Sequence, residues 1–505
     1  MSRMFVAASL ILVTVVSGCS QQVSSVVARA VQGSDSSKDA PTLSKDAYDL
    51  ILKDDYDAAI IKAELAIRKD ATFGEAYKNL ALAYCDSGRV AQALEPAQKA
   101  VMLSPRLDKA HYVLGKILFR LERFNEAVTE LQEAIRINPK YDKAYFLLGS
   151  SFDLLNKPED ALAALNHAVQ LQPDYCQYSR FRDYVAAYAR QKEQTTLPII
   201  VSVKGQPSEY SSSIYSGIFY EALIHHDFDL IEKAADAARA SKEKLPGGVW
   251  KLRMIYAGLS TPYAPVSDHE WNQHINLLEE WTKRKPNSLT AKVALASTYV
   301  SFGWNARGAG FANTVSERNW ELFYNRLDHA QDILMSIRSQ QLCPFWYSVM
   351  QTIALAQDWD RETYEQLFAD AVQSEPTWYE YYKNKVFYLL PRWHGQPGEL
   401  QAYANSLATR SDRSDSAVLY FLVNEYAGLF EQNGGAEPAY PIFKQGFLQL
   451  RKAYGVTQQD VNWACFKALR SSDSAFAVEL VPALKNDPNL QVWGDKQQPA
   501  FPGMN

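Results

Sequence analysis

A block of sequence recurs every 34 residues between positions 74 and 173. Each copy ends in a proline, and small residues occupy the same two places before it. The recurring residues are Pro105, Pro139 and Pro173; Ala93, Ala127 and Ala161; and Ala100, Ala134 and Ala168. A period of this length is typical of paired helices that stack on their neighbours. One pair cannot bury its own apolar faces, so the block predicts an array of at least about three units.

The middle copy shows how one unit is built. Two apolar stripes at helical spacing predict two helices, and they consist of Leu114, Gly115 and Leu118 and of Ala127, Leu131 and Ala134. Small residues lie where the two helices cross, because a bulky side chain would hold the backbones apart. Pro139 cannot continue the second helix and marks the turn into the next unit.

These residues resemble the tetratricopeptide repeat. Three copies match its pattern, through Tyr77, Leu80, Ala81, Tyr84, Ala93, Ala97, Ala100 and Pro105; His111, Leu114, Gly115, Leu118, Ala127, Leu131, Ala134 and Pro139; and Tyr145, Leu148, Gly149, Phe152, Ala161, Leu165, Ala168 and Pro173. A degenerate copy precedes them, with Ala59, Ala63 and Ala66 in register and Ala71 in place of the proline. The resemblance covers about residues 43–175. It implies a concave groove that binds protein, and it implies no chemistry.

The N-terminal sequence predicts a lipid anchor. Arg3 precedes an apolar run at residues 5–16, which is too short to span a membrane but suits a signal peptide. The run ends in Val16-Ser17-Gly18-Cys19, which resembles the cleavage motif of bacterial lipoproteins and predicts lipid, such as palmitate, on Cys19. The alternative is an ordinary signal peptide with a chance cysteine. By the same resemblance, Ser20 favours the outer membrane and a chain that faces the periplasm.

The predicted fold class is all-α, in two domains. We expect a signal peptide at residues 1–18, a flexible tether at 19–42, a repeat solenoid with a capping helix at 43–190, a linker at 191–213 and a tryptophan-rich helical domain at 214–500. All eleven tryptophans lie at Trp250 or later. Residues 364–376 and 462–484 still echo the repeat spacing, so this half is predicted to be a decayed repeat domain that continues the solenoid or folds back on it.

Composition excludes some classes of function. The 505 residues are 47% hydrophobic and 22% charged, as in ordinary globular proteins. The formal net charge of −5 argues against nucleic acid as the partner. Four cysteines remain besides Cys19, namely Cys85, Cys176, Cys343 and Cys465, without a Cys-x-x-Cys pair. Structural zinc is therefore not expected, and buried free thiols are favoured over a disulfide.

The first helix of each repeat would line the groove. Its groove positions are Glu75, Lys78, Leu82 and Cys85; Lys109, Tyr112, Lys116 and Phe119; and Lys143, Phe146, Ser150 and Asp153. Lysines beside exposed aromatic rings suit a peptide with acidic groups. The alternative is that Tyr112, Phe119 and Phe146 pack inside the protein. Leu82, Val113 and Leu147 replace the polar members of the known carboxylate clamp, which excludes that clamp.

Two loops of the second half stand out. Residues 304–310 and 390–395, together with 343–346, resemble an uncharacterised bacterial domain family over residues 245–500. A possible anion site would combine Trp304, Arg307, Arg392, Trp393 and His394. The favoured alternative is that the arginines stack on tryptophans and bond loop carbonyls.

No motif predicts catalysis, a metal or a cofactor. Gly308-Ala309-Gly310 lacks the third glycine of a dinucleotide fingerprint and follows a helix. His269 and His274 are five residues apart, and a zinc pair on a helix needs four. The adjacent His225 and His226 are expected at the surface.

The sequence therefore favours a non-enzymatic, lipid-anchored periplasmic adaptor that holds a protein or peptide in the groove. Its layout is similar to that of outer-membrane lipoproteins that help to assemble secretins, pili or β-barrels. The alternative is an enzyme or small-ligand receptor in residues 245–500, with the repeats recruiting its client. Convergence of Arg307, Arg392 and His394 in one cleft would favour that alternative. The oligomeric state is left open.

Overall fold

A computed structural model describes residues 37–192, 208–263, 267–308, 310–339, 343–429 and 439–484. The chain forms two compact units, residues 1–182 and 183–505. Every named element in the described part of the chain is a helix, and an isolated bridge joins Lys244 to Trp250. The predicted all-α class is confirmed. Cys19 lies outside the described residues, and so do residues 197–203, for which the sequence predicts one short extended segment.

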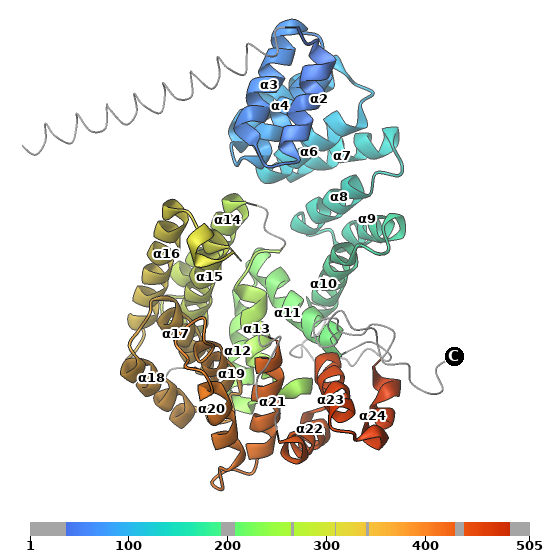
Figure 1. The fold of residues 1–505 in the computed structure, drawn as a ribbon. Coiled ribbons are helices and arrows are strands. Elements are labelled where there is room, and N and C mark those ends of the chain that lie inside the picture. Colours follow the sequence, from blue (N-terminus) through green and yellow to red (C-terminus); the bar gives the residue numbers. More distant parts are fainter. Residues whose placement is uncertain are drawn as a thin grey trace, which may run out of the picture. The chain divides into compact units, whose positions relative to one another are not determined.

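The first unit is a series of helix pairs (Figure 1). Its helices are α2 (Ala40–Ile51), α3 (Tyr56–Lys69), α4 (Gly74–Asp86), α5 (Val90–Leu103), α6 (Asp108–Arg120), α7 (Phe124–Ile137), α8 (Asp142–Leu154) and α9 (Pro158–Leu171). Helix α10 (Cys176–Lys192) follows and crosses the boundary between the units. Helix α2 begins at Ala40, inside the segment predicted as a tether.

Small residues allow the two helices of a repeat to approach closely. A Cβ atom added to Gly115 would lie 2.8 Å from Cγ of Leu131, and one added to Gly149 would lie 2.6 Å from Cγ of Leu165. Real Cβ contacts are longer than this, so a larger residue would force the helices apart. The alanines at the repeat positions, such as Ala127, are fully buried.

The turn inside each repeat follows one backbone design. In each turn, one residue after the end of the first helix has positive φ, namely Asp54, Gly88, Glu122 and Asn156. The next N–H then donates to the carbonyl five residues earlier, in the pairs Asp55 to Leu50 (3.1 Å), Arg89 to Tyr84 (2.8 Å), Arg123 to Leu118 (2.9 Å) and Lys157 to Phe152 (2.9 Å). This bond satisfies a carbonyl that the helix end leaves open. The four turns are 34 residues apart, as the sequence period requires.

The second unit contains fourteen α-helices and three short 3₁₀ turns within the described residues. They are α11 (Ser208–Ile224), α12 (Phe228–Ser241), η1 (Pro246–Gly248), α13 (Lys251–Leu259), α14 (Asp268–Arg284), α15 (Leu289–Arg307), η2 (Ala312–Thr314), α16 (Glu317–Met335), α17 (Pro344–Ala356), α18 (Arg361–Ser374), α19 (Glu380–Tyr388), α20 (Glu399–Ala408), α21 (Ser416–Gly428), α22 (Tyr440–Tyr454), α23 (Gln458–Arg470), α24 (Ser474–Leu480) and η3 (Val481–Ala483). Helix α11 begins at Ser208, inside the segment predicted as a linker.

Three hairpins of the second unit keep the turn of the repeats. Positive φ recurs at His226, Asp358 and Ser472. The following N–H groups donate in the same way, from Asp227 to Ala222 (2.7 Å), Trp359 to Ala354 (3.0 Å) and Asp473 to Ala468 (2.9 Å). These turns join α11 to α12, α17 to α18 and α23 to α24. The last two turns belong to the helix pairs that contain residues 364–376 and 462–484, the segments whose spacing echoes the repeat.

Aromatic side chains fill the core of the second unit. Its largest fully buried residues include Trp281, Trp378, Tyr256, Tyr364, Tyr381, Tyr382 and Tyr388. Two of them have well-defined partners for their polar ends: Trp378 Nε1 donates to Ser348 Oγ (2.8 Å), and Tyr381 donates to the carbonyl of Pro344 (3.1 Å). Buried Trp and Tyr need such partners, because an unpaired polar atom in a core is destabilising.

Cys85, Cys343 and Cys465 are free and buried, whereas Cys176 is free but exposed at the start of α10. None of the described helices is long and apolar enough to cross a membrane.

Candidate functional site

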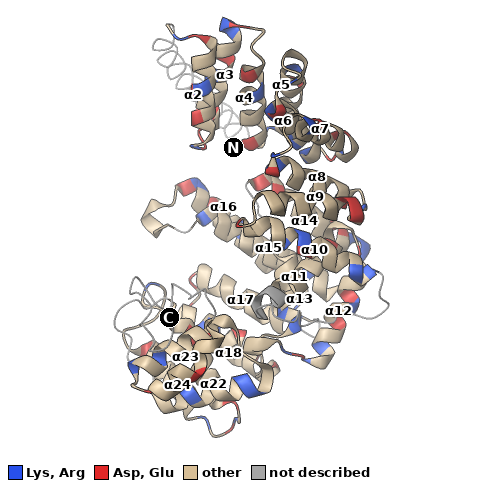
Figure 2. Ribbon diagram, turned by 90° about the vertical axis from the view of Figure 1, so that its right-hand side faces the viewer, with Lys and Arg blue, Asp and Glu red and all other residues tan. Residues whose placement is uncertain are grey.

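The first helices of the repeats carry the predicted groove positions. Helices α4, α6 and α8 each follow a tight turn, and α2 occupies the equivalent place at the start of the array. Charged residues of both signs are spread over these helices (Figure 2). The predicted groove lysines differ from one another in burial and in pairing.

Lys78 is buried, with 6% of its surface exposed. Its Nζ lies 3.7 Å from the carboxylate of Glu75 and 5.5 Å from the ring centroid of Tyr48. Burial lowers the pKa of Lys78, the charge of Glu75 offsets part of that effect, and the nearby Lys109 lowers the pKa further. Lys78 and Lys109, on neighbouring first helices, are thus close enough to interact, with the acidic Glu75 and Asp108 beside them.

Lys116 forms an ion pair between two repeats. Its Nζ lies 2.6 Å from the carboxylate of Asp86 on α4, and both side chains are half-buried. Burial by itself would lower the pKa of Lys116, but the charge of Asp86 prevails and raises it. This lysine is therefore already neutralised by an internal partner. Lys109 and Lys143 are exposed at the beginning of α6 and α8.

The three groove aromatics are half-buried and have ring partners within the first unit. Tyr112 packs on Tyr141 with ring centroids 4.9 Å apart. Phe146 stacks on Tyr178 (4.8 Å) and meets the edge of Phe181 (5.5 Å), both on α10. Phe119 contacts Phe124 (5.5 Å). Internal packing, the alternative stated above, therefore covers part of each ring. It covers Phe146 most, because two rings of α10 pack on it.

The structure adds tyrosines that the sequence analysis did not place in this site. Tyr48 is 38% exposed beside Lys78, and Tyr178 donates to the carboxylate of Asp142 (2.8 Å). Tyr141 holds the place equivalent to Leu107 and Phe73, one residue before each first helix. The 34-residue register could have identified Tyr141. Tyr48 lies in the degenerate copy, where that register is weakest.

The remaining groove positions are structural. Ser150 Oγ donates to the carbonyl of Phe146 (3.0 Å), and Arg120 Nη1 donates to the carbonyl of Cys85 (2.6 Å). Asp153 is buried and Leu82 is half-buried. These contacts bond each helix to itself or to the preceding repeat.

The two loops predicted as an anion site have internal partners. Arg307 Nη1 donates to the carbonyls of Gly308 (2.9 Å) and Gly310 (3.1 Å), and its guanidinium lies 5.6 Å from the rings of Trp304 and Trp320. These contacts are those of the favoured alternative, in which an arginine stacks on tryptophan and bonds loop carbonyls.

The other members of that set have different partners. Arg392 lies over the ring of Phe387 (5.4 Å). His394 contacts the carbonyl of Leu355 (3.3 Å) and the carboxylate of Asp358 (3.2 Å). Trp304 and Trp393 do meet, edge to face at 5.8 Å. The tryptophans therefore converge, while the cationic side chains bond separate groups.

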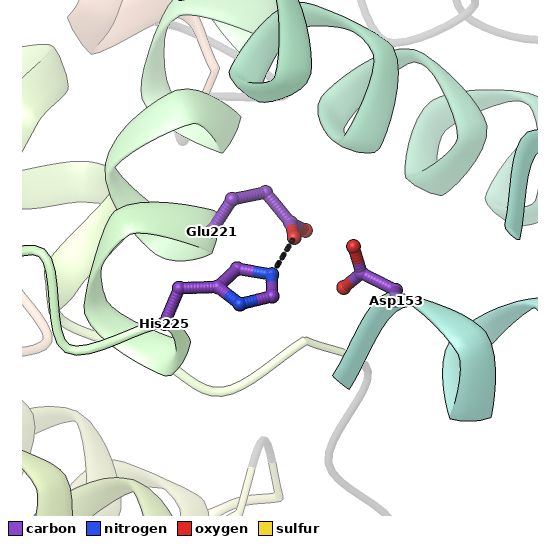
Figure 3. Close-up of side chains that lie close together, drawn as sticks. All are labelled: Asp153, Glu221 and His225. Atoms are coloured by element: carbon purple, nitrogen blue, oxygen red, sulfur yellow. Dashed lines mark ion pairs between the residues drawn. The ribbon is translucent and has the colours of Figure 1, made fainter. Parts of the chain in front are cut away.

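One histidine lies in an unexpected place. His225, directly after α11, is largely buried and stacks on Tyr188 with ring centroids 5.1 Å apart. It lies 3.9 Å from the carboxylate of Glu221, one turn earlier (Figure 3). Its neighbour His226 is more exposed and lies 3.3 Å from Glu280. Only the second fits the expected surface position, because the left-handed turn at His226 directs the two side chains differently.

Comparisons with known proteins agree on the repeat region. The family model described as anaphase-promoting complex, cyclosome, subunit 3, matches residues 53–134, and the tetratricopeptide-repeat model matches residues 112–175. No curated protein matches the chain.

Similar solved structures cover about a third of the chain. They include MamA, residues 41 to the end, from Desulfovibrio magneticus RS-1, at 20% identity over 30% of this chain and 86% of that one (TM-score 0.28). A thermophilic TPR protein from Thermus thermophilus is 23% identical over 39% and 98% (TM-score 0.27). An O-GlcNAc transferase mutant from Thermobaculum terrenum is 18% identical over 30% and 26% (TM-score 0.24).

Proposed function

The chain is a tetratricopeptide-repeat protein, and from this premise we propose that it is a lipid-anchored adaptor of the bacterial cell envelope. Such repeat arrays are scaffolds for protein–protein interaction. In the finer form of the proposal, the first unit holds a protein or peptide partner on the face of its first helices. The aromatic second unit then serves as a second platform, and the adaptor assists a secretion or pilus assembly.

One observation carries the choice of face. Lys109 and Lys143 are exposed at the start of consecutive first helices, and neither ammonium group has a hydrogen-bond or ion-pair partner among the described residues. They lie on the same helices as the ring pairs of Tyr112 and Phe146. Apolar ring edges beside unpaired cations favour a partner with both apolar and acidic side chains.

The anchor is supported by the N-terminal sequence. Residues 5–16 and the Val16-Ser17-Gly18-Cys19 motif favour processing before Cys19, and two or three acyl chains hold a protein on a bilayer far better than one. Ser20 favours the outer membrane. Labelling of growing cells with an alkyne analogue of palmitate tests this part: the chain should take up label, and a Cys19→Ser variant should not. An unlabelled parent chain would remove the anchor from the proposal.

Photo-crosslinking tests the binding face. Benzoylphenylalanine placed at Tyr48, an exposed ring on the groove side, should capture partner proteins in living cells. The same group at Met102, which is 69% exposed on the second helix α5, is the matched control. Capture at position 48 and not at 102 supports the groove. Equal capture at both positions, or none at position 48, would count against it.

The competing assignment is an enzyme or small-ligand receptor in residues 245–500. It requires Arg307, Arg392 and His394 to converge in one cleft. Their contacts to loop carbonyls, a phenylalanine ring and Asp358 favour the adaptor instead.

A further inference from the structure

A set of cations recurs at one edge of the repeat array. Arg106 and Lys109 lie at the start of α6, and Lys140 and Lys143 hold the same places at the start of α8. All four side chains are exposed. None of their charged groups has a hydrogen-bond or ion-pair partner within the described part of the chain. We refer to these four residues as the basic edge.

The acidic residues within the basic edge are engaged by the array itself. Asp108 is half-buried and accepts from Nδ2 of Asn138 (2.7 Å). Asp142 is half-buried and accepts from the hydroxyl of Tyr178 (2.8 Å). Each carboxylate accepts from a neutral donor of a following segment. At the beginnings of α6 and α8, the exposed charged side chains are therefore these four cations.

The opposite edge of the array has a different arrangement. There the turns between first and second helices place Arg89 and Arg123 at equivalent positions. Arg89 is paired with Asp57 (2.8 Å), and Arg123 is paired with Glu126 (2.6 Å). Internal pairing thus neutralises these two arginines, while Lys157 at the equivalent place in the third turn is exposed and lies over the ring of Phe152. At the basic edge, by contrast, all four cations remain for a partner.

We infer that the basic edge binds an acidic segment of the protein partner, with carboxylates three residues apart, laid across the beginnings of α6 and α8. The inference deepens the proposed function and rests on it. The spacing follows from the array. Packed helices lie about 8–10 Å apart, and a polyproline II chain has three residues per turn and advances about 3.1 Å per residue. Every third side chain of such a segment therefore lies on the same face, about 9 Å further on, and reaches the next helix. Ring edges of Tyr112 and Tyr141 would then accept the apolar residues in between.

Exposed charges of this kind act mainly on encounter and selection. Pairs at the rim of an interface raise the association rate, are screened by salt and reject partners of like charge. The most direct evidence would therefore be that the chain binds one charge pattern more tightly than others, and that this difference in affinity decreases as the salt concentration rises.

Fluorescence anisotropy with synthetic peptides tests the inference on the full chain purified in detergent. One 12-residue probe carries Glu at every third position among Ala and Leu, a second carries the same residues with the glutamates clustered, and a third replaces Glu by Lys. The first should bind most tightly, and its affinity should fall by at least about tenfold between 50 and 300 mM salt. The Lys109→Glu, Lys143→Glu variant should bind the first peptide at least about tenfold more weakly than the parent chain does at the same salt concentration.

Control variants separate charge from fold. Lys53→Glu changes an exposed lysine in the α2–α3 turn, at the opposite edge, and should leave binding unchanged. Lys109→Gln, Lys143→Gln removes charge without adding repulsion and should have an intermediate effect. Helical circular dichroism of each variant identifies any that unfolds.

Several outcomes would overturn the inference. One is equal binding of the Glu and Lys peptides, and another is full affinity in the charge-reversed variant. A third is binding of phosphatidylglycerol vesicles through these lysines without binding of any acidic peptide, which would assign the edge to a membrane. None of these outcomes would contradict the adaptor proposal if photo-crosslinking at position 48 still captures partner proteins. The two proposals can therefore fail separately.

Discussion

His111 Nδ1 lies 2.7 Å from the carboxylate of Glu130, joining the first and second helices of one repeat. The other ring nitrogen, Nε2, lies 3.2 Å from the carbonyl of Pro105. Both nitrogens therefore face acceptors, and only the protonated ring can donate to both. The bond to Glu130 raises the pKa of His111, burial lowers it in part, and the Pro105 carbonyl raises it again.

Stability of the repeat array should fall as the pH rises past His111. Because the folded pKa lies above the unfolded value of 6.5, the folded state binds the extra proton. This contribution is complete below pH 6.5 and is lost as the pH rises through the raised folded pKa. Urea unfolding between pH 5.5 and 8.5 should show this loss, and a His111→Gln variant should lack it. A parent and variant with parallel pH profiles would contradict the assignment.

Glycines at the helix crossing and in the turn should respond differently to substitution. Gly115→Ala places a Cβ against Leu131 and should lower the free energy of unfolding by about 1–3 kcal/mol. Gly88 has φ of +82° but open space around it, so Gly88→Ala should cost about 1 kcal/mol from backbone strain. Gly88→Asn should cost less, since Asn156 adopts the same conformation in the equivalent turn. Chemical denaturation measures all three, and equal losses would refute this division.

Lys244 should make the second unit more stable at alkaline pH. Its ammonium lies 4.0 Å from the ring centroid of Tyr379 and 4.8 Å from that of Tyr454. Burial lowers the pKa of Lys244 to about 8, with partial offset by Asp415 and Glu375. Between pH 8 and 10.5 the unfolded chain binds the extra proton, so stability rises with pH in that window. The free energy of unfolding should rise less in Lys244→Met than in the parent chain. An identical rise would show that Lys244 is not responsible.

The hydrogen bond between Trp378 and Ser348 should contribute more to the free energy of unfolding than an exposed hydrogen bond does, because both groups are buried. Trp378→Phe should lower the free energy of unfolding by about 3 kcal/mol, through lost packing and an unpaired Ser348 hydroxyl. Ser348→Ala should cost about 1–2 kcal/mol, since it leaves the indole N–H unpaired. A double-mutant cycle isolates the bond, and strictly additive losses would show that it contributes nothing.

Much of the first unit could be predicted from residue pattern because its contacts are local. The period, the prolines and the small residues identified the helix pairs, and Gly115 and Gly149 lie where the pattern requires them. In the second unit, the spacing at 364–376 and 462–484 echoed the repeat, but the turn shared by its three hairpins could not be predicted. Their left-handed residues are His226, Asp358 and Ser472, which carry no common sequence signal. The shared feature is a backbone hydrogen bond that many residue types allow.

In the candidate site, the sequence pattern predicted which helices carry the groove residues but not how those residues are paired or buried. Lys109 and Lys116 lie on one helix and both were expected in the groove, yet Lys116 is neutralised by Asp86 while Lys109 has no partner in the described structure. Phe146 was expected to line the groove, and the capping helix covers much of its ring. Such differences depend on which side chain of a neighbouring repeat comes within reach.

The sequence by itself determined that this chain builds stacked helix pairs, because periodic apolar and small residues leave a helix one way to bury its face. It also indicated which end carries the expected lipid. Only the tertiary structure decided which charges remain for a partner, because pairing and burial depend on distances between helices that no linear spacing contains.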